Sequence, residues 1–467
     1  MRGSRLSLCV ATAALAASGC APALRLEPLP VLASDSWSAH ALDTGSVAAA
    51  PLATLLGSPE LARLTDRALA YNPDIAIAAA RVAQSSALLR AARQTSLPGV
   101  SLSAGASRER KVAATLPDFR DAFARLDVDL DLDLFGKLRA ERTAAQARTY
   151  AAQLETDAVR LAVESDVASA FVQRAALAAR VAILDSSIVR AAELERIVRV
   201  RVDEGAATKV DLGLQSIRLL NLREQQSRLA QALDQTRTAL ALLAGEEAPR
   251  FELAAGRLSD LQRPDLAPPA PAALLAARPD IAAAEALVAA ANGDVGAARA
   301  SFYPAVSVSL SGLVGNVITG PLSKAVTLGS ALLAPIFSRG KLESQFAYAS
   351  AVQVETVERY RQTILAALKE TEDARGAIDR SAERARLVDQ TVIQAQATAR
   401  LANLRYIEGE EDLLSVLDAQ QLQNDAEDAA VLASQEQLFA RIALYRASGG
   451  ARAGMLARAG GNPRIAY

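Results

Sequence analysis

The stretch Arg278-Pro279-Asp280-Ile281 decides the fold, because it is a second copy of Asn72-Pro73-Asp74-Ile75. Four further pairs of anchors recur in the same order and at nearly constant spacing. They are Pro98 and Pro304, Phe135-Gly136-Lys137-Leu138 and Arg339-Gly340-Lys341-Leu342, Val202-Asp203-Glu204-Gly205 and Tyr406-Ile407-Glu408-Gly409, and Ala244-Gly245 and Ser448-Gly449. Such an ordered series is hard to obtain by chance, so the chain is predicted to contain one structural repeat twice.

Each copy predicts the same elements, namely a helix, two strands, a long helix and a return helix. The expected helices are 59–96, 137–203 and 209–243 in the first copy, and 271–301, 341–407 and 413–447 in the second. Pro73-Asp74 and Pro279-Asp280 are possible turn starts inside the first helix of each copy. Each long helix would extend for about 100 Å. Apolar or small residues recur every seven positions from Leu154 and from Ala158, which indicates coiled-coil packing. A long dimeric coiled-coil rod remains an alternative for this helix alone.

The segments expected to form strands alternate strictly between apolar and polar residues. Residues 305–311 alternate Val or Leu with Ser, and residues 126–134 alternate Leu or Val with Asp. We expect 100–106 to pair with 126–134, and 305–314 to pair with 325–335. Such alternation over about ten residues is typical of transmembrane β-barrels. A half-buried strand of a soluble sheet is the main alternative.

Calcium binding is a second alternative for the aspartate run. Asp127, Asp129 and Asp131 have loop-like spacing, but Leu132 stands where an EF-hand loop needs glycine. Four strands cannot close a barrel and would leave exposed edges. Copies of the chain must therefore pool their strands, and three copies would supply twelve.

The N-terminus predicts an exported lipoprotein. Arg2 and Arg5 precede the apolar run 6–17, and small residues lead to Cys20, so residues 1–19 resemble a signal peptide. The segment before Cys20 resembles a lipoprotein box, although Ala17 replaces the usual Leu. An ordinary secretory signal with an incidental cysteine is the alternative. By resemblance to lipoprotein sorting signals, Ala21 rather than Asp implies sorting to the outer membrane. Since no later run of about 18 uninterrupted apolar residues follows, membrane crossing is assigned to the strands.

Composition excludes several classes of function. The 467 residues carry 51 Lys and Arg against 52 Asp and Glu, so the basic excess of a nucleic-acid binder is missing. One histidine and two cysteines cannot build a zinc site or a disulfide framework within one chain. Aromatic residues make up only 4%, which fits long helices packed through alanine better than a large globular core. We therefore expect no enzyme, no nucleic-acid partner, and no cofactor besides a covalent lipid on Cys20.

The chain resembles the TolC-like outer-membrane efflux proteins, and within them the NodT-type lipoproteins of tripartite (RND-type) efflux systems. The resemblance covers about residues 40–450. Its carrying stretches are Ala276-Ala277-Arg278-Pro279-Asp280-Ile281, Asp131-Leu132-Asp133-Leu134-Phe135-Gly136-Lys137-Leu138-Arg139, Ser301-Phe302-Tyr303-Pro304, Glu408-Gly409 with Val416-Leu417-Asp418-Ala419-Gln420, and Leu444-Tyr445-Arg446-Ala447. The chain departs from the pattern at Ala17 and at Arg339, which replaces the repeat partner of Phe135.

The resemblance implies a mainly α fold with a small membrane β-barrel. Three chains would form a twelve-stranded barrel in the outer membrane and a periplasmic tunnel of long helices. A periplasmic adaptor and an inner-membrane pump would dock at the tunnel's lower end, where Gly205 and Gly409 form the hairpin tips. By the same resemblance, Asp211 and Asp418 lie at the mouth. A further aspartate of the family is Ser415 here.

Three more carboxylates, Glu410, Glu411 and Asp412, directly follow Gly409. For each of these residues taken alone, an acidic turn exposed to solvent is the alternative explanation. In a threefold mouth each would be triplicated, and rings of carboxylates favour cations. The expectation is a cation-selective constriction formed by Asp211, Glu410, Glu411, Asp412 and Asp418.

The expected organisation has six segments. These are the signal peptide 1–19, a lipid-anchored extended segment 20–58, repeat one 59–262, a proline-rich linker 263–271, repeat two 272–450 and a tail 451–467. The predicted function is a passive exit duct for small molecules such as drugs or metal ions. The alternatives are a channel for type I protein secretion, and a periplasmic coiled-coil scaffold or adaptor lipoprotein.

Overall fold

A computed structural model describes residues 50–109, 119–253, 256–317 and 323–451. The predicted signal peptide, Cys20 and most of the C-terminal tail lie outside these residues. The chain divides into two compact units. The first combines Ala79–Leu154 with Ala282–Thr363, and the second combines Glu155–Ile281 with the segments before Ala79 and after Thr363. Each unit therefore takes residues from both repeats.

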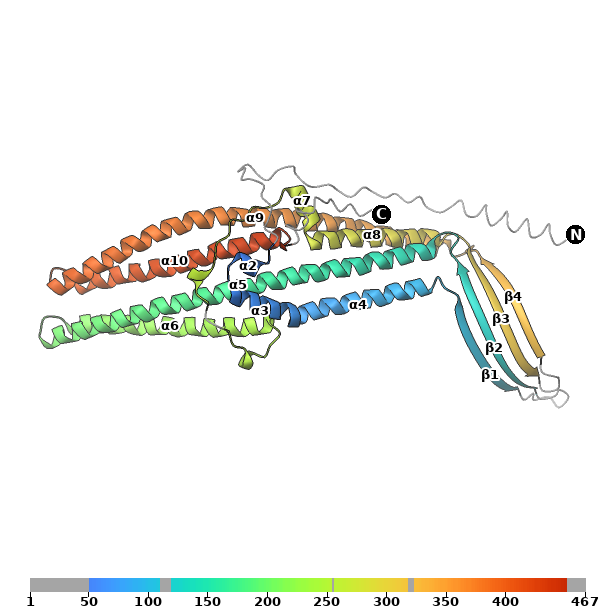
Figure 1. Cartoon of the computed structure of the whole chain (residues 1–467), viewed down its shortest axis with the longest axis horizontal. Coiled ribbons are helices and arrows are strands. Elements are labelled where there is room, and N and C mark those ends of the chain that lie inside the picture. Colours follow the sequence, from blue (N-terminus) through green and yellow to red (C-terminus); the bar gives the residue numbers. More distant parts are fainter. Residues whose placement is uncertain (1–49, 110–118, 254–255, 318–322, 452–467) are drawn as a thin grey trace. The chain divides into compact units, whose positions relative to one another are not determined.

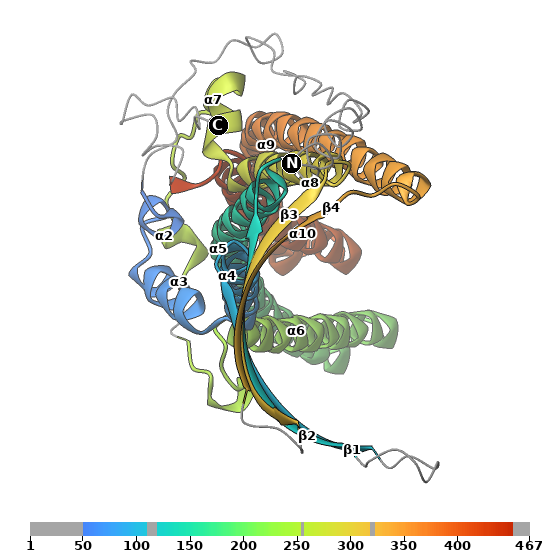
Figure 2. The same ribbon diagram turned by 90° about the vertical axis from the view of Figure 1, so that its right-hand side faces the viewer.

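The first unit contains a single four-stranded antiparallel sheet. Its strands are β1 (Gly99–Glu109), β2 (Phe119–Leu132), β3 (Ala305–Val317) and β4 (Ser323–Leu333), in that spatial order. The predicted hairpin of each repeat is present, and the pairing of β2 with β3 joins the two hairpins. Figures 1 and 2 show one continuous curved sheet. Strands β1 and β4 form its two edges.

The register separates an apolar face from a polar face. Residues that pair directly across the strands share a face. One row across all four strands is Val100, Val128, Leu310 and Leu328, and the next is Ser101, Asp127, Ser311 and Thr327. The apolar face is open to solvent, since Leu102 is 76% exposed and Leu328 is 75% exposed. An isolated sheet with this much exposed apolar surface requires lipid or protein to cover it.

The aspartate run lies in strand β2, not in a calcium loop. Asp127 and Asp129 pair with Ser311 and Ser309 of β3 in the ladder, and Arg125 forms an ion pair with Asp127 at 2.7 Å. Strand geometry keeps all these carboxylates on one face but spreads them along the strand. The described residues hold no group of three or more His, Cys, Asp or Glu side chains that could bind a metal ion.

Two strands end earlier than the sequence predicted. Strand β2 stops at Leu132, and Asp133 instead caps the following helix, accepting hydrogen bonds from the backbone N–H groups of Leu138 (3.0 Å) and Arg139 (2.8 Å). Strand β4 stops at Leu333, short of Pro335, which has no N–H to donate to a ladder.

The first predicted helix of each repeat is broken in two. Residues 59–96 form α3 (Pro59–Tyr71) and α4 (Pro73–Gln94), and residues 271–301 form α7 (Pro271–Ala277) and α8 (Pro279–Ala300). Proline suits the first turn of a helix and disfavours helix in the residue before it. Asn72 and Arg278 are accordingly extended.

The long helical hairpins agree closely with the prediction. They are α5 (Lys137–Asp203) with α6 (Lys209–Leu243), and α9 (Arg339–Glu408) with α10 (Leu413–Ala447). Only α9 differs, starting two residues earlier and ending one residue later than expected. The pairs run side by side in Figure 1. The short elements are α2 (Leu52–Leu55), η2 (Ala248–Arg250) and η3 (Leu258–Asp260).

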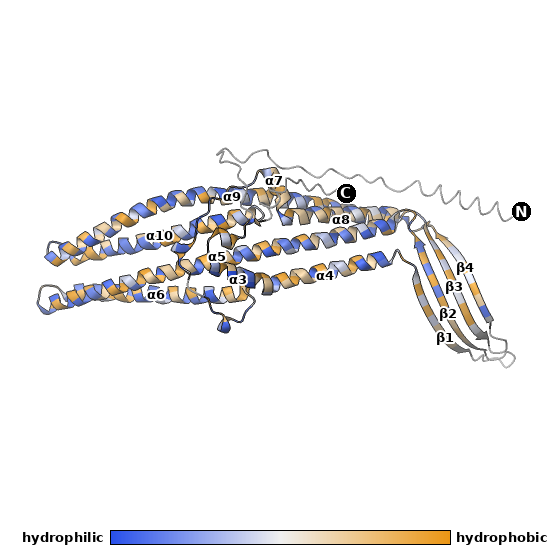
Figure 3. Ribbon diagram, viewed as in Figure 1, coloured by the Kyte–Doolittle hydropathy of each residue, from blue (hydrophilic) through white to orange (hydrophobic). Residues whose placement is uncertain are grey.

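Helices α5 and α8 are rich in alanine. Alanine is the commonest residue of α5 and α8, and each contains an 18-residue window apolar enough by composition to cross a membrane. In each window 44% of the residues are buried. Figure 3 shows apolar and polar residues interleaved along all the long helices. At Gly293 of α8 an added Cβ would lie 2.9 Å from the Ala144 Cβ, so small residues set how closely α8 and α5 approach.

The repeated Pro-Asp-Ile motif forms the same joint in both repeats. Asn72 donates a hydrogen bond from Nδ2 to the Leu243 carbonyl at the end of α6 (2.9 Å), and Arg278 donates one from Nη1 to the Ala447 carbonyl at the end of α10 (3.1 Å). Arg278 also binds Asp280 and Glu370. The motif therefore fastens a return helix to the helix that precedes the hairpin, once in each repeat.

The glycine after each return helix is tightly packed at this joint. Gly245 and Gly449 have φ of +70° and +87°. An added Cβ at Gly245 would lie 2.2 Å from the Tyr71 carbonyl oxygen. Because left-handed backbone already costs a non-glycine residue about 1–2 kcal/mol, we expect Gly245→Ala to lower the free energy of unfolding by about 3 kcal/mol or more. Thermal unfolding followed by circular dichroism would measure this. Gly213→Ala, in open space on α6, is the control and should change it little.

A partly buried carboxylate lies beside the core of the second unit. Glu164 of α5 accepts hydrogen bonds from the Leu52 backbone N–H (2.8 Å) and the Tyr445 hydroxyl (3.2 Å), and that hydroxyl accepts one from the Ala451 N–H (3.1 Å). Burial raises the pKa of Glu164 despite these donors, and burial beside Glu164 raises the pKa of Tyr445. This network joins both ends of the described chain to α5.

The raised pKa predicts a pH dependence of stability. A carboxyl group whose folded pKa is raised stabilises the fold below its unfolded pKa, and that contribution is lost as pH rises through the folded value. We expect Glu164→Gln to remove this loss, so that its unfolding free energy falls less than that of the native chain as the pH rises above 4.5. Denaturant titrations at several pH values would test it. Equal slopes for the two proteins would contradict the assignment.

Candidate functional site at the hairpin tips

Both hairpins turn at a glycine in left-handed conformation. Gly205 follows α5 with φ of +75°, and Gly409 follows α9 with φ of +86°. The next N–H groups return to the helix ends, Ala206 to the Arg201 carbonyl (2.7 Å) and Glu410 to the Arg405 carbonyl (2.9 Å). No described atom lies within 4 Å of a Cβ added at either glycine. The two turns therefore expose bare backbone at the ends of the hairpins.

Two of the sequence-predicted carboxylates begin the return helices. Asp211 forms a capping box with Thr208, accepting from its N–H (2.8 Å) while the Thr208 hydroxyl accepts from the Asp211 N–H (3.2 Å). Asp412 caps α10 by accepting from the Ser415 N–H (2.8 Å), which lowers the pKa of Asp412. Both acids are thus held in place by helix capping.

The other three predicted carboxylates have no partner among the residues that the structure describes. Glu410 and Asp418 are exposed and Glu411 is partly exposed, and within the described ranges none of them makes a hydrogen bond or ion pair. Leu194, Val198, Tyr406, Leu413 and Val416 form a small buried cluster, with Leu212 packed against it. That cluster brings together the first turns of α6 and α10, and with them Asp211 and Asp412. The sequence-predicted acids therefore gather at one end of the second unit.

Arg201, which the sequence did not mark as a site residue, links the two tips. Its Nη2 donates to the Tyr406 and Ile407 carbonyls at 3.0 and 3.1 Å, and its guanidinium lies 4.3 Å from the centre of the Tyr406 ring. This residue of α5 therefore satisfies two carbonyls in the last turn of α9. It is a contact between repeat one and repeat two.

A polar ladder continues from this contact along α5 and α10. Gln173, Arg180 and Ser187 are spaced by seven on α5, and their partners occur in reverse order along α10. The pairs are Gln173 with Gln435, Arg180 with Asp428 (2.5 and 3.0 Å), and Ser187 with Asn424 (2.7 Å). The signal was available in the sequence as polar residues at heptad spacing. These positions lie outside the apolar heptad series that starts at Leu154 and at Ala158.

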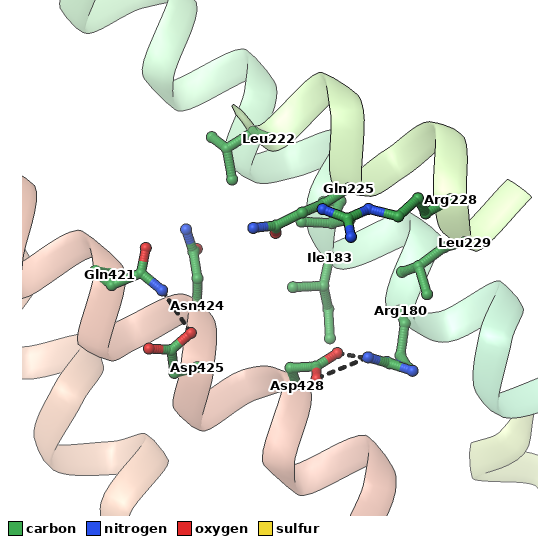
Figure 4. Close-up of a pocket in the computed structure, with 11 residues that line it drawn as sticks. Arg180, Ile183, Leu222, Gln225, Arg228, Leu229, Gln421, Asn424, Asp425 and Asp428 are labelled. Carbon is green, nitrogen blue, oxygen red and sulfur yellow. Dashed lines mark hydrogen bonds and ion pairs between the residues drawn. The ribbon is translucent and has the colours of Figure 1, made fainter. Parts of the chain in front are cut away.

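A cleft of about 260 Å³ opens beside the ladder, between α5, α6 and α10. Figure 4 shows side chains of α6 on one side and of α10 on the other, with the Arg180–Asp428 pair at one end. Its lining residues include Leu222, Gln225, Arg228, Gln421 and Asp425.

The repeats, the sheet and the hairpins define an outer-membrane efflux protein. The chain belongs to the outer membrane efflux protein family, whose model matches residues 64–246 and 270–450. It is therefore a protein of the outer membrane and of an efflux channel family. The predicted fold class of helices with a small β part is confirmed, and the rod and scaffold alternatives are wrong.

Two relatives illustrate the match. The pyoverdine export outer membrane protein OpmQ of Pseudomonas putida is 34% identical over 405 residues, which cover 84% of this chain and 86% of the relative. The outer membrane protein OprJ of Pseudomonas aeruginosa is 30% identical over 454 residues, covering 93% of each chain.

Solved structures share the fold. The outer-membrane channel OprN superposes with a TM-score of 0.83 at 25% identity, covering 92% of this chain and 98% of that one. The outer membrane protein VceC of Vibrio cholerae gives 0.75 at 26% identity, covering 84% and 96%.

Proposed function

We propose that three copies of this chain form the passive exit duct of a tripartite efflux pump. The observation that carries the proposal is the four-stranded sheet, whose edges β1 and β4 are unpaired within the described residues and whose apolar face is exposed. Pairing β4 of one chain with β1 of the next would close a barrel and remove both edges. The apolar face would then contact lipid, and the polar face with Asp127 and Ser311 would line the pore.

The hairpin tips are the proposed docking point for a periplasmic adaptor. Gly205 and Gly409 offer exposed backbone that a partner can approach closely, and they lie in corresponding turns of the two repeats. The inner-membrane pump would supply the energy, and this chain would carry out no catalysis and need no cofactor. The names of relatives such as the pyoverdine exporter and the toluene efflux pump protein TtgF favour small molecules as cargo.

At the mouth, we assign ion selection to Asp418 with Glu410 and Glu411, which are free to face water. Asp211 and Asp412 would add charge from their fixed capping positions. The proposed lipid on Cys20 would attach the chain to the membrane. Mass spectrometry of the N-terminal peptide would detect the acyl groups, and an unmodified Cys20 would contradict lipidation.

The assembly is tested by its behaviour in detergent. Outer-membrane fractions should yield a trimer that migrates as a compact species in electrophoresis when unheated. After boiling it should migrate as a monomer slightly smaller than the 48.9 kDa of the full chain, because the signal peptide is removed. Chemical cross-linking before extraction should give the same stoichiometry. Recovery of the protein as a soluble monomer would contradict the proposal that it forms a trimeric duct.

A further inference from the structure

The two repeats correspond residue by residue within the first unit. Helices α4 and α8 both contain 22 residues and start 206 positions apart. The pairing of Val100 with Val128 in the first hairpin recurs as the pairing of Val306 with Leu332 in the second. Strands β1 and β3 are therefore equivalent at an offset of 206, and β2 and β4 are equivalent at an offset of 204. Each contact between repeat one and repeat two thus has a defined counterpart.

Strand β2 pairs with β3 within the chain, and the equivalent strands, β4 and β1, are the two edges of the sheet. Val128 of β2 lies opposite Leu310 of β3. Their equivalents are Leu332 of β4 and Ala104 of β1, and both of these belong to the apolar face. A pair of β4 with β1 in this register keeps that face continuous. A shift by one residue would instead place apolar residues beside polar ones.

Helix α5 packs against α8 within the chain, and the equivalent helices are α9 and α4. Gly293 of α8 lies very close to α5, since a Cβ added there would lie 2.9 Å from the Ala144 Cβ. The equivalents of these two residues are Ala87 of α4 and Tyr348 of α9. Tyr348 is 73% exposed, and Ala87 is exposed as well. Both side chains are therefore open to contact with a second chain.

The equivalent helix faces differ in chemistry. Between α5 and α8, Arg148 forms an ion pair with Asp294. The equivalent residues are Val352 of α9 and Leu88 of α4, and Leu88 is 67% exposed. Alanine also replaces glycine on α4, and Tyr348 replaces alanine on α9. A contact of α9 with α4 would therefore be apolar and wider than that of α5 with α8, because the larger side chains need more room.

We propose that the contact between neighbouring chains repeats the contact between the two repeats. Strand β4 pairs with β1 of the next chain so that Leu332 lies opposite Ala104. Tyr348 packs on Ala87 of the next chain and fills the wider space between α9 and α4. The partner is a second copy of this chain, because its β1 and α4 are equivalent to the β3 and α8 that repeat one already contacts. The inference rests on the proposed function, which supplies the ring of three chains.

Cysteine cross-linking in outer membranes tests the strand register. Oxidation of the double variant Ala104→Cys with Leu332→Cys should give disulfide-linked dimers and trimers that survive boiling and return to monomers with reductant, because directly opposed side chains are close enough to bridge. Ala106→Cys with Leu332→Cys, shifted by two residues, is the matched control and should cross-link at least about tenfold less. Ala104→Cys alone measures any cross-linking through Cys20. Cross-linking of the 106 pair that equals or exceeds that of the 104 pair would overturn the register.

The helix contact is tested in the same way. Ala87→Cys with Tyr348→Cys should cross-link between chains, whereas Ala87→Cys with Glu355→Cys, about two turns further along α9, should not. Tyr348→Ala should lower the temperature at which the trimer dissociates in detergent by about 10 °C, and Tyr348→Phe should keep the native temperature. An unchanged dissociation temperature in Tyr348→Ala would contradict the helix contact.

Failure of the proposed function has a different signature. If the native protein yields no trimer from outer membranes, the duct itself is contradicted. If the native trimer forms but neither the 104–332 pair nor the 87–348 pair cross-links, only the equivalence of the two contacts is contradicted.

Discussion

Replacement of Asp418 by Asn is expected to abolish most of the cation preference of the channel. The side chain is exposed and unpaired in the described structure, so its full charge is available to an ion in the mouth. A unit charge about 4 Å away contributes about 1 kcal/mol in water, which is roughly a fivefold change in preference, and three chains would contribute three such charges. Reversal potentials in planar bilayers under a salt gradient would measure the loss.

The matched control for this experiment is Asp389→Asn. Asp389 is also exposed and without a partner among the described residues, but it lies on α9 rather than after the Gly409 turn. Its replacement should leave the reversal potential unchanged. If both substitutions change the reversal potential equally, Asp418 acts only through the net charge of the protein. If neither changes it, Asp418 does not line the pore.

Replacement of Arg201 by Ala is expected to loosen the two hairpin tips and raise the resting conductance at least tenfold. The change removes two hydrogen bonds to carbonyls and the contact with the Tyr406 ring. Hydrogen bonds from a charged donor contribute about 1.5–3 kcal/mol each, and the ring contact about 0.5–1 kcal/mol. Single-channel recording would give the open fraction directly.

Two substitutions, Arg201→Lys and Arg199→Ala, are the controls. Arg201→Lys keeps the charge but loses the planar fork that reaches both carbonyls, so it should resemble Arg201→Ala more than the native protein. Arg199→Ala removes an exposed arginine whose partner is Glu195 on the same helix, and it should have no effect. A closed Arg201→Ala channel would exclude a role for this contact in holding the tips.

Much of the fold was predictable because the same structural repeat occurs twice in the sequence. Alternation of Val306 and Ser307 predicts a strand with two unlike faces, and Pro59, Lys209 and Leu413 mark helix starts that the structure reproduces. The breaks after Asn72 and Arg278 were predicted only as possible turn starts at Pro73 and Pro279, because helical periodicity continues through both and only the proline interrupts it.

The candidate site was predictable only in part. The glycines of the turns are visible in the sequence because a left-handed turn selects glycine. The capping roles of Asp211 and Asp412 follow from their positions just before or within the first helical turn. Arg201 could not be identified, because it acts across the two repeats. No local pattern reports which residue of repeat two lies opposite a residue of repeat one.

The two unlike edges of the sheet have a genetic consequence. Since β1 and β4 are different strands, each chain of the proposed ring would pair its β1 with one neighbour and its β4 with the other. A chain that folds but carries a damaged β4 can still enter a ring through β1, and one such chain leaves the ring unsealed. If normal and damaged chains are made in equal amounts, only about one trimer in eight contains normal chains alone. Edge-strand alleles of this protein should therefore be dominant.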